Sequence, residues 1–306
     1  MNIFVIWYES TLPDLLGGQA PWAVILLFAL ITQLGDVWFL FLLSGVLYVG
    51  GEYIPYVGID RRRGVFIIGL VLTYVALIGV LKGVLLLPRP PGATEPPALR
   101  WIPSIFAVLF TSITTAKGSG FPSGHALGAT MVWGGLALVI DRGSYRVRFG
   151  IVGVVVALVS LSRLVLGVHY FVDVLAGIIL GIVVLGTLYW LAENGTHPER
   201  VLLTAVAIGG VGLSVNLTFE SVIASGGAVG GWVVWRTVAE VTPNQPSTRR
   251  EVIVALFVGV IANGIFGSVY ILDIPYPFTF LGTATAVGTA VGAPLISKRL
   301  SRVETE

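Results

Sequence analysis

Long apolar segments recur along the chain from the twenties to the 290s, separated by short stretches of Pro, Gly and charged residues. A helix needs about 20 consecutive apolar residues to cross the hydrocarbon core of a bilayer. Of the 306 residues, 56% are hydrophobic and 11% are charged, whereas about 25% are charged in an ordinary soluble domain. Too little charge is left to coat a water-exposed surface of this size, so the sequence excludes a soluble protein and predicts a polytopic membrane protein.

We expect an all-α bundle of about nine membrane-spanning helices, because an open sheet leaves backbone groups unsatisfied in lipid and the sequence lacks the alternating pattern of a barrel. The apolar segment 22–34 is expected at the membrane surface, and 101–113, too short to span, as a surface or re-entrant lid. Glycine pairs four residues apart, such as Gly177 with Gly181, predict close helix packing. The spans are predicted near residues 36–51, 64–87, 122–140, 148–166, 170–192, 201–217, 221–239, 252–272 and 277–297.

The positive charges divide unequally between the two faces that nine spans define. Five Lys and Arg residues fall on one face and thirteen on the other, which the positive-inside rule makes cytoplasmic. We therefore predict an integral multi-pass protein of the cytoplasmic membrane, with its N-terminus outside and its C-terminus inside. The net charge of +2 argues against a nucleic-acid partner, and zero cysteines exclude disulfides and thiolate metal sites. The cytoplasmic set is Arg61, Arg62, Arg63, Arg142, Arg146, Arg148, Arg200, Arg236, Arg249, Arg250, Lys298, Arg299 and Arg302.

Charged and polar residues gather at the outside ends of four predicted spans. The segment KGVLLLPRP carries Lys82 and Arg89 seven residues apart, about two helical turns on one face, and two cations there suit an anion. The segment GSGFPSGHALG places Ser123, Gly124 and His125 at a helix N-terminus, where backbone N–H groups and the helix dipole favour a phosphate. The topology alone puts these segments on one face, which predicts a phosphate site.

The segment SRLVLGVHYFVD completes the predicted site. Arg163 ends one span, and His169 begins the next with Asp173 four residues further on. At this spacing the carboxylate accepts a hydrogen bond from one imidazole nitrogen and leaves the other to attack. Fixed cations suit a phosphoryl group in transfer, and two histidines supply a nucleophile and an acid for the leaving group. The residues leave open which histidine attacks, although the position of Asp173 favours His169.

With these residues the chain resembles the type 2 phosphatidic acid phosphatase superfamily, which includes bacterial lipid-pyrophosphate phosphatases, glucose-6-phosphatase and vanadium haloperoxidases. Its pattern is Lys-x6-Arg-Pro, then Pro-Ser-Gly-His, then Ser-Arg-x5-His-x3-Asp. All three parts occur here in order and without departure, between Lys82 and Asp173. The resemblance covers roughly residues 35–195.

The resemblance implies that His169 is a nucleophile that forms a phosphohistidine, that Asp173 orients it, and that His125 protonates the leaving oxygen. It implies no metal and no other cofactor. The groups implied to hold the phosphate are Lys82, Arg89, Arg163, the Ser123 hydroxyl and the Gly124 amide.

Structural roles are the alternatives to this interpretation. Lys82 and Arg89 can place their charges at a membrane edge, residues 123–125 can simply cap a helix, and His169 with Asp173 can form a structural pair or half a metal site. Asp36, at the start of the first predicted span, is expected to cap that helix.

We therefore expect a phosphoric monoester or diphosphate hydrolase that acts on a phosphorylated lipid at the extracytoplasmic face. Three other hypotheses stand beside it: hydrolysis of a soluble sugar phosphate as in glucose-6-phosphatase, a lipid phosphotransferase, and a non-catalytic transporter or lipid-binding protein. Residues 1–195 are predicted to form the phosphatase core and residues 196–306 additional transmembrane helices, for which the sequence indicates no role. Membrane lipids are the expected surroundings, and no oligomeric state is indicated.

Overall fold

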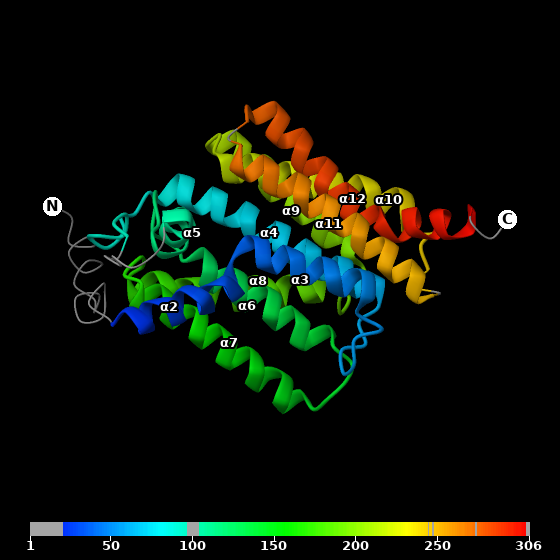
Figure 1. Cartoon of the computed structure of the whole chain (residues 1–306), viewed down its shortest axis with the longest axis horizontal. Coiled ribbons are helices and arrows are strands. Elements are labelled where there is room, and N and C mark those ends of the chain that lie inside the picture. Colours follow the sequence, from blue (N-terminus) through cyan, green and yellow to red (C-terminus); the bar gives the residue numbers. More distant parts are fainter. Residues whose placement is uncertain (1–20, 97–103, 244, 247, 273, 304–306) are drawn as a thin grey trace.

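The computed structural model describes residues 21–96, 104–243, 245–246, 248–272 and 274–303 (Figure 1). These residues contain helices and no strand, which confirms the predicted all-α class. The elements in chain order are α2 (Trp22–Ile31), the 3-10 helix η2 (Thr32–Gly35), α3 (Val37–Gly50), α4 (Arg61–Leu85), α5 (Ser104–Thr114), α6 (Gly124–Val139), α7 (Tyr145–Val165), α8 (Phe171–Leu191), α9 (Pro198–Val215), α10 (Phe219–Val238), α11 (Arg249–Ile271) and α12 (Tyr276–Val303).

Within the described residues, six helices are long and apolar enough to cross a membrane: α4, α7, α8, α9, α11 and α12. The α2–η2 segment and α3 are bent by 50° at their junction and make a seventh if counted as one broken span. The predicted number of nine is therefore not confirmed. Two predicted spans fall short for physical reasons: α6 has only 16 residues, and α10 has a run of small and polar residues, SGGAVGG, that lowers its hydropathy.

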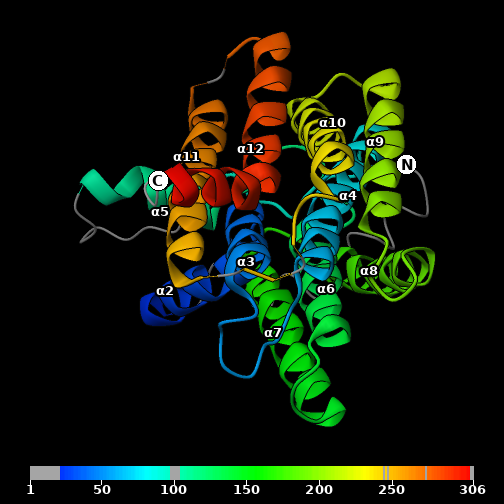
Figure 2. The ribbon, with the colours of Figure 1, turned by 90° about the vertical axis from the view of Figure 1, so that its right-hand side faces the viewer.

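Helix α4 forms the centre of the molecule, and its apolar window is 78% buried. It packs against α3, α6, α9 and α10. Figure 2 shows α6 to α8 on one side of α4 and α9 to α12 on the other. The main hydrophobic core joins Phe66 and Leu70 of α4 to Leu202 of α9 and Val287 of α12, so residues on both sides of the predicted boundary at 195 share one core. The division into two parts stays a prediction.

Close packing at glycines holds α8 against α6, as the glycine spacing predicts. A Cβ atom added to Gly177 would lie 2.7 Å from the Ser123 carbonyl oxygen, and one added to Gly181 would lie 2.8 Å from Cβ of Thr130. Only glycine permits this approach, which fixes the N-terminus of α8 beside that of α6.

The first helix breaks at Asp36, which caps α3 as predicted by accepting a hydrogen bond from the Trp38 amide at 3.5 Å. Gly35 precedes the break, and a Cβ added there would lie 2.6 Å from Cγ1 of Val159 in α7. This close approach holds η2 against α7 and brings Asp36 to the end of the bundle where α6 begins.

The basic N-terminal end of α4 does more than contribute to the unequal charge of the two faces, because it also holds two helices together. The helix begins at Arg61, with the Asp60 carboxylate accepting from the Arg63 amide at 2.9 Å. Arg61 is buried, and its Nη2 lies 2.6 Å from Oε1 of Glu251, which is also buried. This ion pair joins the N-termini of α4 and α11. In Figure 1 these helix ends and the C-terminal end of α12 lie at the right, opposite α5.

Candidate functional site

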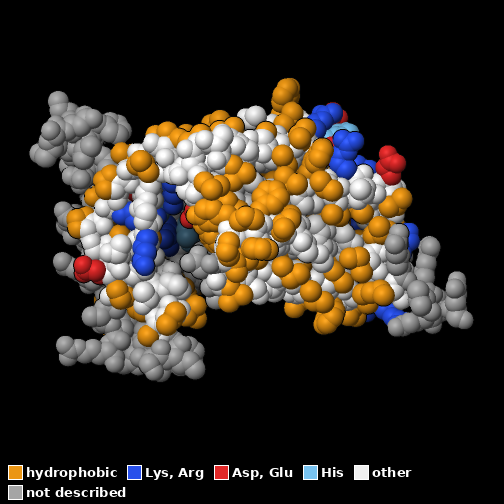
Figure 3. Space-filling view, turned by 90° about the horizontal axis from the view of Figure 1, so that it is seen from above, with side chains coloured by type: hydrophobic (Ala, Val, Ile, Leu, Met, Phe, Trp, Pro, Cys, Tyr) orange, Lys and Arg blue, Asp and Glu red, His pale blue; other side chains and the backbone are white. Residues whose placement is uncertain are grey.

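Three chain segments meet at the other end of the bundle. They are the C-terminal end of α4 with the residues that follow it, the N-terminus of α6, and the α7–α8 turn at residues 166–170. Figure 3 shows Lys and Arg side chains in a hollow toward the left end, with histidine and acidic side chains beside them. This is the end at which the sequence predicts the site.

The buried His169 lies at the centre of this region and contacts a partner through each ring nitrogen. Its Nδ1 lies 3.2 Å from Oδ2 of Asp173, and its Nε2 lies 3.2 Å from Nη1 of Arg89. The carboxylate only accepts and the guanidinium only donates, so Nδ1 carries the hydrogen and Nε2 carries a lone pair. The unprotonated nitrogen therefore points at a cation.

Asp173 holds this geometry from the first turn of α8. Its Oδ2 also accepts from the Tyr170 amide at 2.9 Å, and its carbonyl oxygen accepts from the Ser123 amide at 2.9 Å. The first bond caps α8 and the second ties the N-termini of α6 and α8 together. Asp173 can therefore cap α8 and orient the His169 ring at the same time.

Arg89 is held in place by main-chain oxygens. Its Nη1 donates to the Val168 carbonyl at 2.8 Å, and its Nε donates to the carbonyls of Lys117 and Gly118 at 3.2 and 3.1 Å. Gly118 has a φ of 71°, a left-handed conformation that glycine adopts without strain. The guanidinium is therefore positioned before any anion binds.

The surroundings of His169 keep its imidazole neutral. Burial lowers the pKa of His169 well below its ordinary value of 6.5. Nearby positive charges lower this pKa further, in decreasing order those of Arg89, Arg163, Lys82 and His125. An unprotonated ring in a cluster of cations is suited to attack an electrophilic phosphorus.

Ser123 precedes Gly124, the first residue of α6, and is fully buried. Its Oγ has no hydrogen-bond partner within the described part of the chain. An unpaired buried hydroxyl costs free energy that an accepting ligand oxygen would recover. The helix N-terminus here supplies the amides and the dipole expected for a phosphate.

Arg163 reaches the site from the end of α7. Its Nη1 donates to Oγ1 of Thr32 at 2.7 Å in a buried contact, and its Nε has no partner among the residues described. The charges of Arg89, Glu220, Arg163 and Asp173 act on Lys82, so this lysine lies near the cluster and also near Glu220 at the start of α10.

His125, in the first turn of α6, faces Asp36 at the break between η2 and α3. Its Nε2 lies 3.5 Å from Oδ2 of Asp36. The charges of Arg163 and Lys82 also act on His125, so the second histidine adjoins the same group of cations.

The structure thus brings all eight predicted site residues to one end of the bundle, and their chemical roles stay predictions. Sequence reasoning missed Thr32 and gave Asp36 only its capping role. The Gly35-Asp36 pair signals a break in the first helix, but no local pattern indicates which residues lie opposite it. Within the described residues, no group of three or more His, Asp or Glu side chains is close enough to hold a metal ion.

Fold and site together define a helical membrane protein with a buried histidine–carboxylate pair among Arg and Lys side chains at one end of the bundle. Residues 64–196 match the family model of the PAP2 superfamily, which supports the predicted resemblance to the type 2 phosphatidic acid phosphatases. The match includes every predicted site residue but neither Asp36 nor helices α9 to α12. The comparisons with curated proteins and with solved structures gave no match.

Proposed function

We propose that this membrane phosphatase hydrolyses the phosphate or pyrophosphate of a lipid at the extracytoplasmic face, through a phosphohistidine on His169. The observation that carries the proposal is the position of the His169 ring, with Nδ1 on Asp173 and the unprotonated Nε2 on Arg89. A neutral nucleophile oriented by a carboxylate and directed at an anion-binding group is what phosphoryl transfer requires.

In the first step, the lone pair of His169 Nε2 forms a bond to phosphorus while the bond from phosphorus to the leaving oxygen breaks. His125 donates a proton to that oxygen, and Asp173 stabilises the positive charge that develops on the His169 ring. Arg89 and Arg163 hold the equatorial oxygens, with the other binding groups of the cluster. The leaving alcohol or phosphate departs with the proton that His125 donated to its oxygen.

In the second step, water attacks the phosphohistidine and the N–P bond breaks, which returns the electron pair to Nε2. His125, now unprotonated, takes the proton of the attacking water. Inorganic phosphate leaves and both histidines return to their starting states. No step requires a metal ion.

The membrane surroundings favour a lipid substrate over a soluble one. Large apolar side chains are exposed where α4 ends beside the site: Val84, Leu85 and Leu86 are 56%, 40% and 70% exposed. A substrate whose apolar part stays in the bilayer reaches this site from the side. The excess of Lys and Arg at the opposite end supports an extracytoplasmic position for the site.

The test is phosphate release by the detergent-purified protein, with EDTA present, from phosphatidate, a polyprenyl pyrophosphate and a sugar phosphate. We expect release from a lipid that survives EDTA and is lost in His169→Ala. His197→Ala is the control, because His197 pairs with Glu193 and Glu199 in the α8–α9 turn, away from the site. Release from the sugar phosphate alone would contradict the lipid assignment, and transfer of labelled phosphate to an acceptor without free phosphate would make the protein a transferase.

A further inference from the structure

A cavity adjoins the site on the side of His125. It has a volume of about 350 Å³ and lies between the η2–α3 junction, α5 and α11. Asp36 lines it and contacts His125, so the cavity begins next to the group assigned to protonate the leaving oxygen. Its lining residues are Gln33, Asp36, Val37, Trp38, Leu109, Ser112, Ile113, Phe266 and Gly267.

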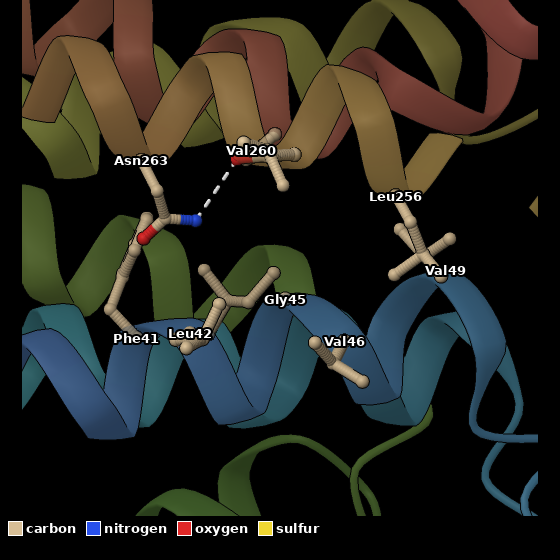
Figure 4. A pocket seen from close by; sticks show the side chains of 11 residues that line it. Phe41, Leu42, Gly45, Val46, Val49, Leu256, Val260 and Asn263 are labelled. Carbon is tan, nitrogen blue, oxygen red and sulfur yellow. Dashed lines mark hydrogen bonds between the residues drawn. The ribbon is translucent and has the colours of Figure 1, made fainter. Parts of the chain in front are cut away.

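A second cavity continues along the same two helices. It has a volume of about 270 Å³ and an almost wholly apolar lining, with Phe41, Gly45 and Val49 of α3 facing Leu256 and Val260 of α11 (Figure 4). The stacked rings of Phe41 and Phe266, with centroids 5.4 Å apart, lie where the two cavities approach each other. This ring pair separates the two cavities, which both lie along α3 and α11, and we call the two cavities together the α3–α11 groove.

The length of this groove suits a lipid chain. From Val37 to Val49, α3 rises about 18 Å at ~1.5 Å per residue. One leaflet occupies about half of the ~30 Å hydrocarbon core, or about 15 Å. The groove therefore reaches from the site across the depth that one hydrocarbon chain occupies.

We propose that the α3–α11 groove binds the hydrocarbon chain of the leaving group. This inference rests on the proposed function. The phosphoryl group lies among the cations around His169, and the leaving oxygen faces His125. The rest of the leaving group then extends past His125, on the side where Asp36 opens the groove. A sugar has no apolar part to bury there.

The groove gives α11 a role in substrate selection. Phe266 and Gly267 line the cavity nearest the site, while Leu256, Gly259 and Val260 line the farther one. All five lie outside the residues that match the family model. Helix α11 thus sets which chain lengths fit, and the residues around His169 carry out the same reaction for all of them.

Two glycines of α11 provide a matched test of the near cavity. A Cβ added to Gly267 or to Gly264 meets no atom within 4 Å, so both positions have open space next to the backbone. Gly267 lines the cavity, whereas Gly264 is exposed and does not line it. Gly267→Leu should lower kcat/KM for long-chain lipid phosphates at least about tenfold. It should leave kcat/KM for a short water-soluble phosphate ester unchanged. Gly264→Leu should change neither.

Gly259, which also has open space around an added Cβ, tests the far cavity. Gly259→Leu should lower kcat/KM only for the longest chains. The substrates are phosphatidates and polyprenyl phosphates of graded length, which distinguish an acyl from a prenyl occupant. Equal effects of Gly267→Leu and Gly264→Leu on every substrate would overturn the groove assignment while hydrolysis itself remained. A wild-type protein that hydrolyses none of the esters would overturn the proposed function and this inference together.

Discussion

Nε2 of His125 lies 3.5 Å from Oδ2 of Asp36, a carboxylate outside the segment that matches the PAP2 family model. The pair parallels His169 and Asp173, whose Nδ1 and Oδ2 lie 3.2 Å apart. Each histidine of the site thus has its own acid, one supplied by the motif and one by the broken first helix. We assign Asp36 as a positioning residue that orients His125 and attracts its protonated form.

Asp36→Asn should lower kcat on alkyl phosphates about tenfold or more with little change in KM, because a less well positioned acid protonates a poor leaving group less effectively. The loss should be much smaller on an aryl phosphate, whose leaving group needs little protonation. Asparagine caps helices as well as aspartate does, so α3 keeps its start. Steady-state kinetics on both esters check this, and an equal loss on both would contradict the assignment.

The pH dependence should follow the neutral state of His169. Burial and the neighbouring cations lower the pKa of His169, so the nucleophile stays unprotonated as the pH falls below 6.5. The acidic limb of kcat/KM, which reports the free enzyme, should therefore lie below pH 6.5. Arg89→Gln removes one of these charges and should move that limb to higher pH.

Lys117→Gln is the control for this experiment, since it removes an exposed lysine from the same end of the molecule. The limb should stay where it is in the wild-type protein. A limb that moves equally in both variants would show that the overall charge of this end, and not the contact of Arg89 with His169, sets the pKa of the nucleophile.

Gly177→Ala should lower turnover several-fold to about tenfold, because the new methyl group presses on the Ser123 carbonyl and shifts the N-terminus of α6. Gly186→Ala on the same helix is the matched control, as a Cβ there meets nothing within 4 Å. Relative activity at equal amounts of folded protein compares the two. Identical activities would show that the close approach at Gly177 does not position the site.

Arg61→Ala should destabilise the protein by about 3–5 kcal/mol, since it leaves the buried Glu251 carboxylate without its guanidinium partner. Arg62→Ala, in the same basic run, should change stability by about 0.5 kcal/mol or less. Thermal unfolding in detergent measures both. A double replacement of Arg61 by Met and Glu251 by Leu should recover part of the loss, and equal midpoints for Arg61→Ala and Arg62→Ala would contradict a structural role for the pair.

Much of this architecture follows from local patterns in the sequence. Helix α3, expected at 36–51, spans Val37–Gly50, and α7, expected at 148–166, spans Tyr145–Val165. Hydropathy and glycine spacing are properties of residues close together in the chain, so the sequence alone is enough to predict the helices that depend on them. The meeting of Lys82, His125 and His169 was also predictable, because alternating spans put their helix ends on one face.

Contacts between distant segments were not predictable in the same way. Asp36 contacts His125 and Thr32 contacts Arg163 only because the first helix breaks at Gly35 and packs against α7. No spacing of residues in the sequence indicates that packing. The burial of Arg61 likewise depends on a partner in α11, far along the chain. Charge patterns indicated which end of the helix Arg61 occupies, but not which acid it meets.

The central claim is that His169 becomes phosphorylated during turnover, and trapping this intermediate tests it most directly. The purified protein is mixed with a lipid phosphate labelled in its phosphoryl group, quenched rapidly under alkaline conditions and mapped by peptide mass spectrometry. We expect an acid-labile label on His169, absent in His169→Ala and accumulated in His125→Ala on an aryl phosphate, because the second step lacks its base. Hydrolysis without any labelled enzyme, or a label that persists in His169→Ala, would contradict the mechanism.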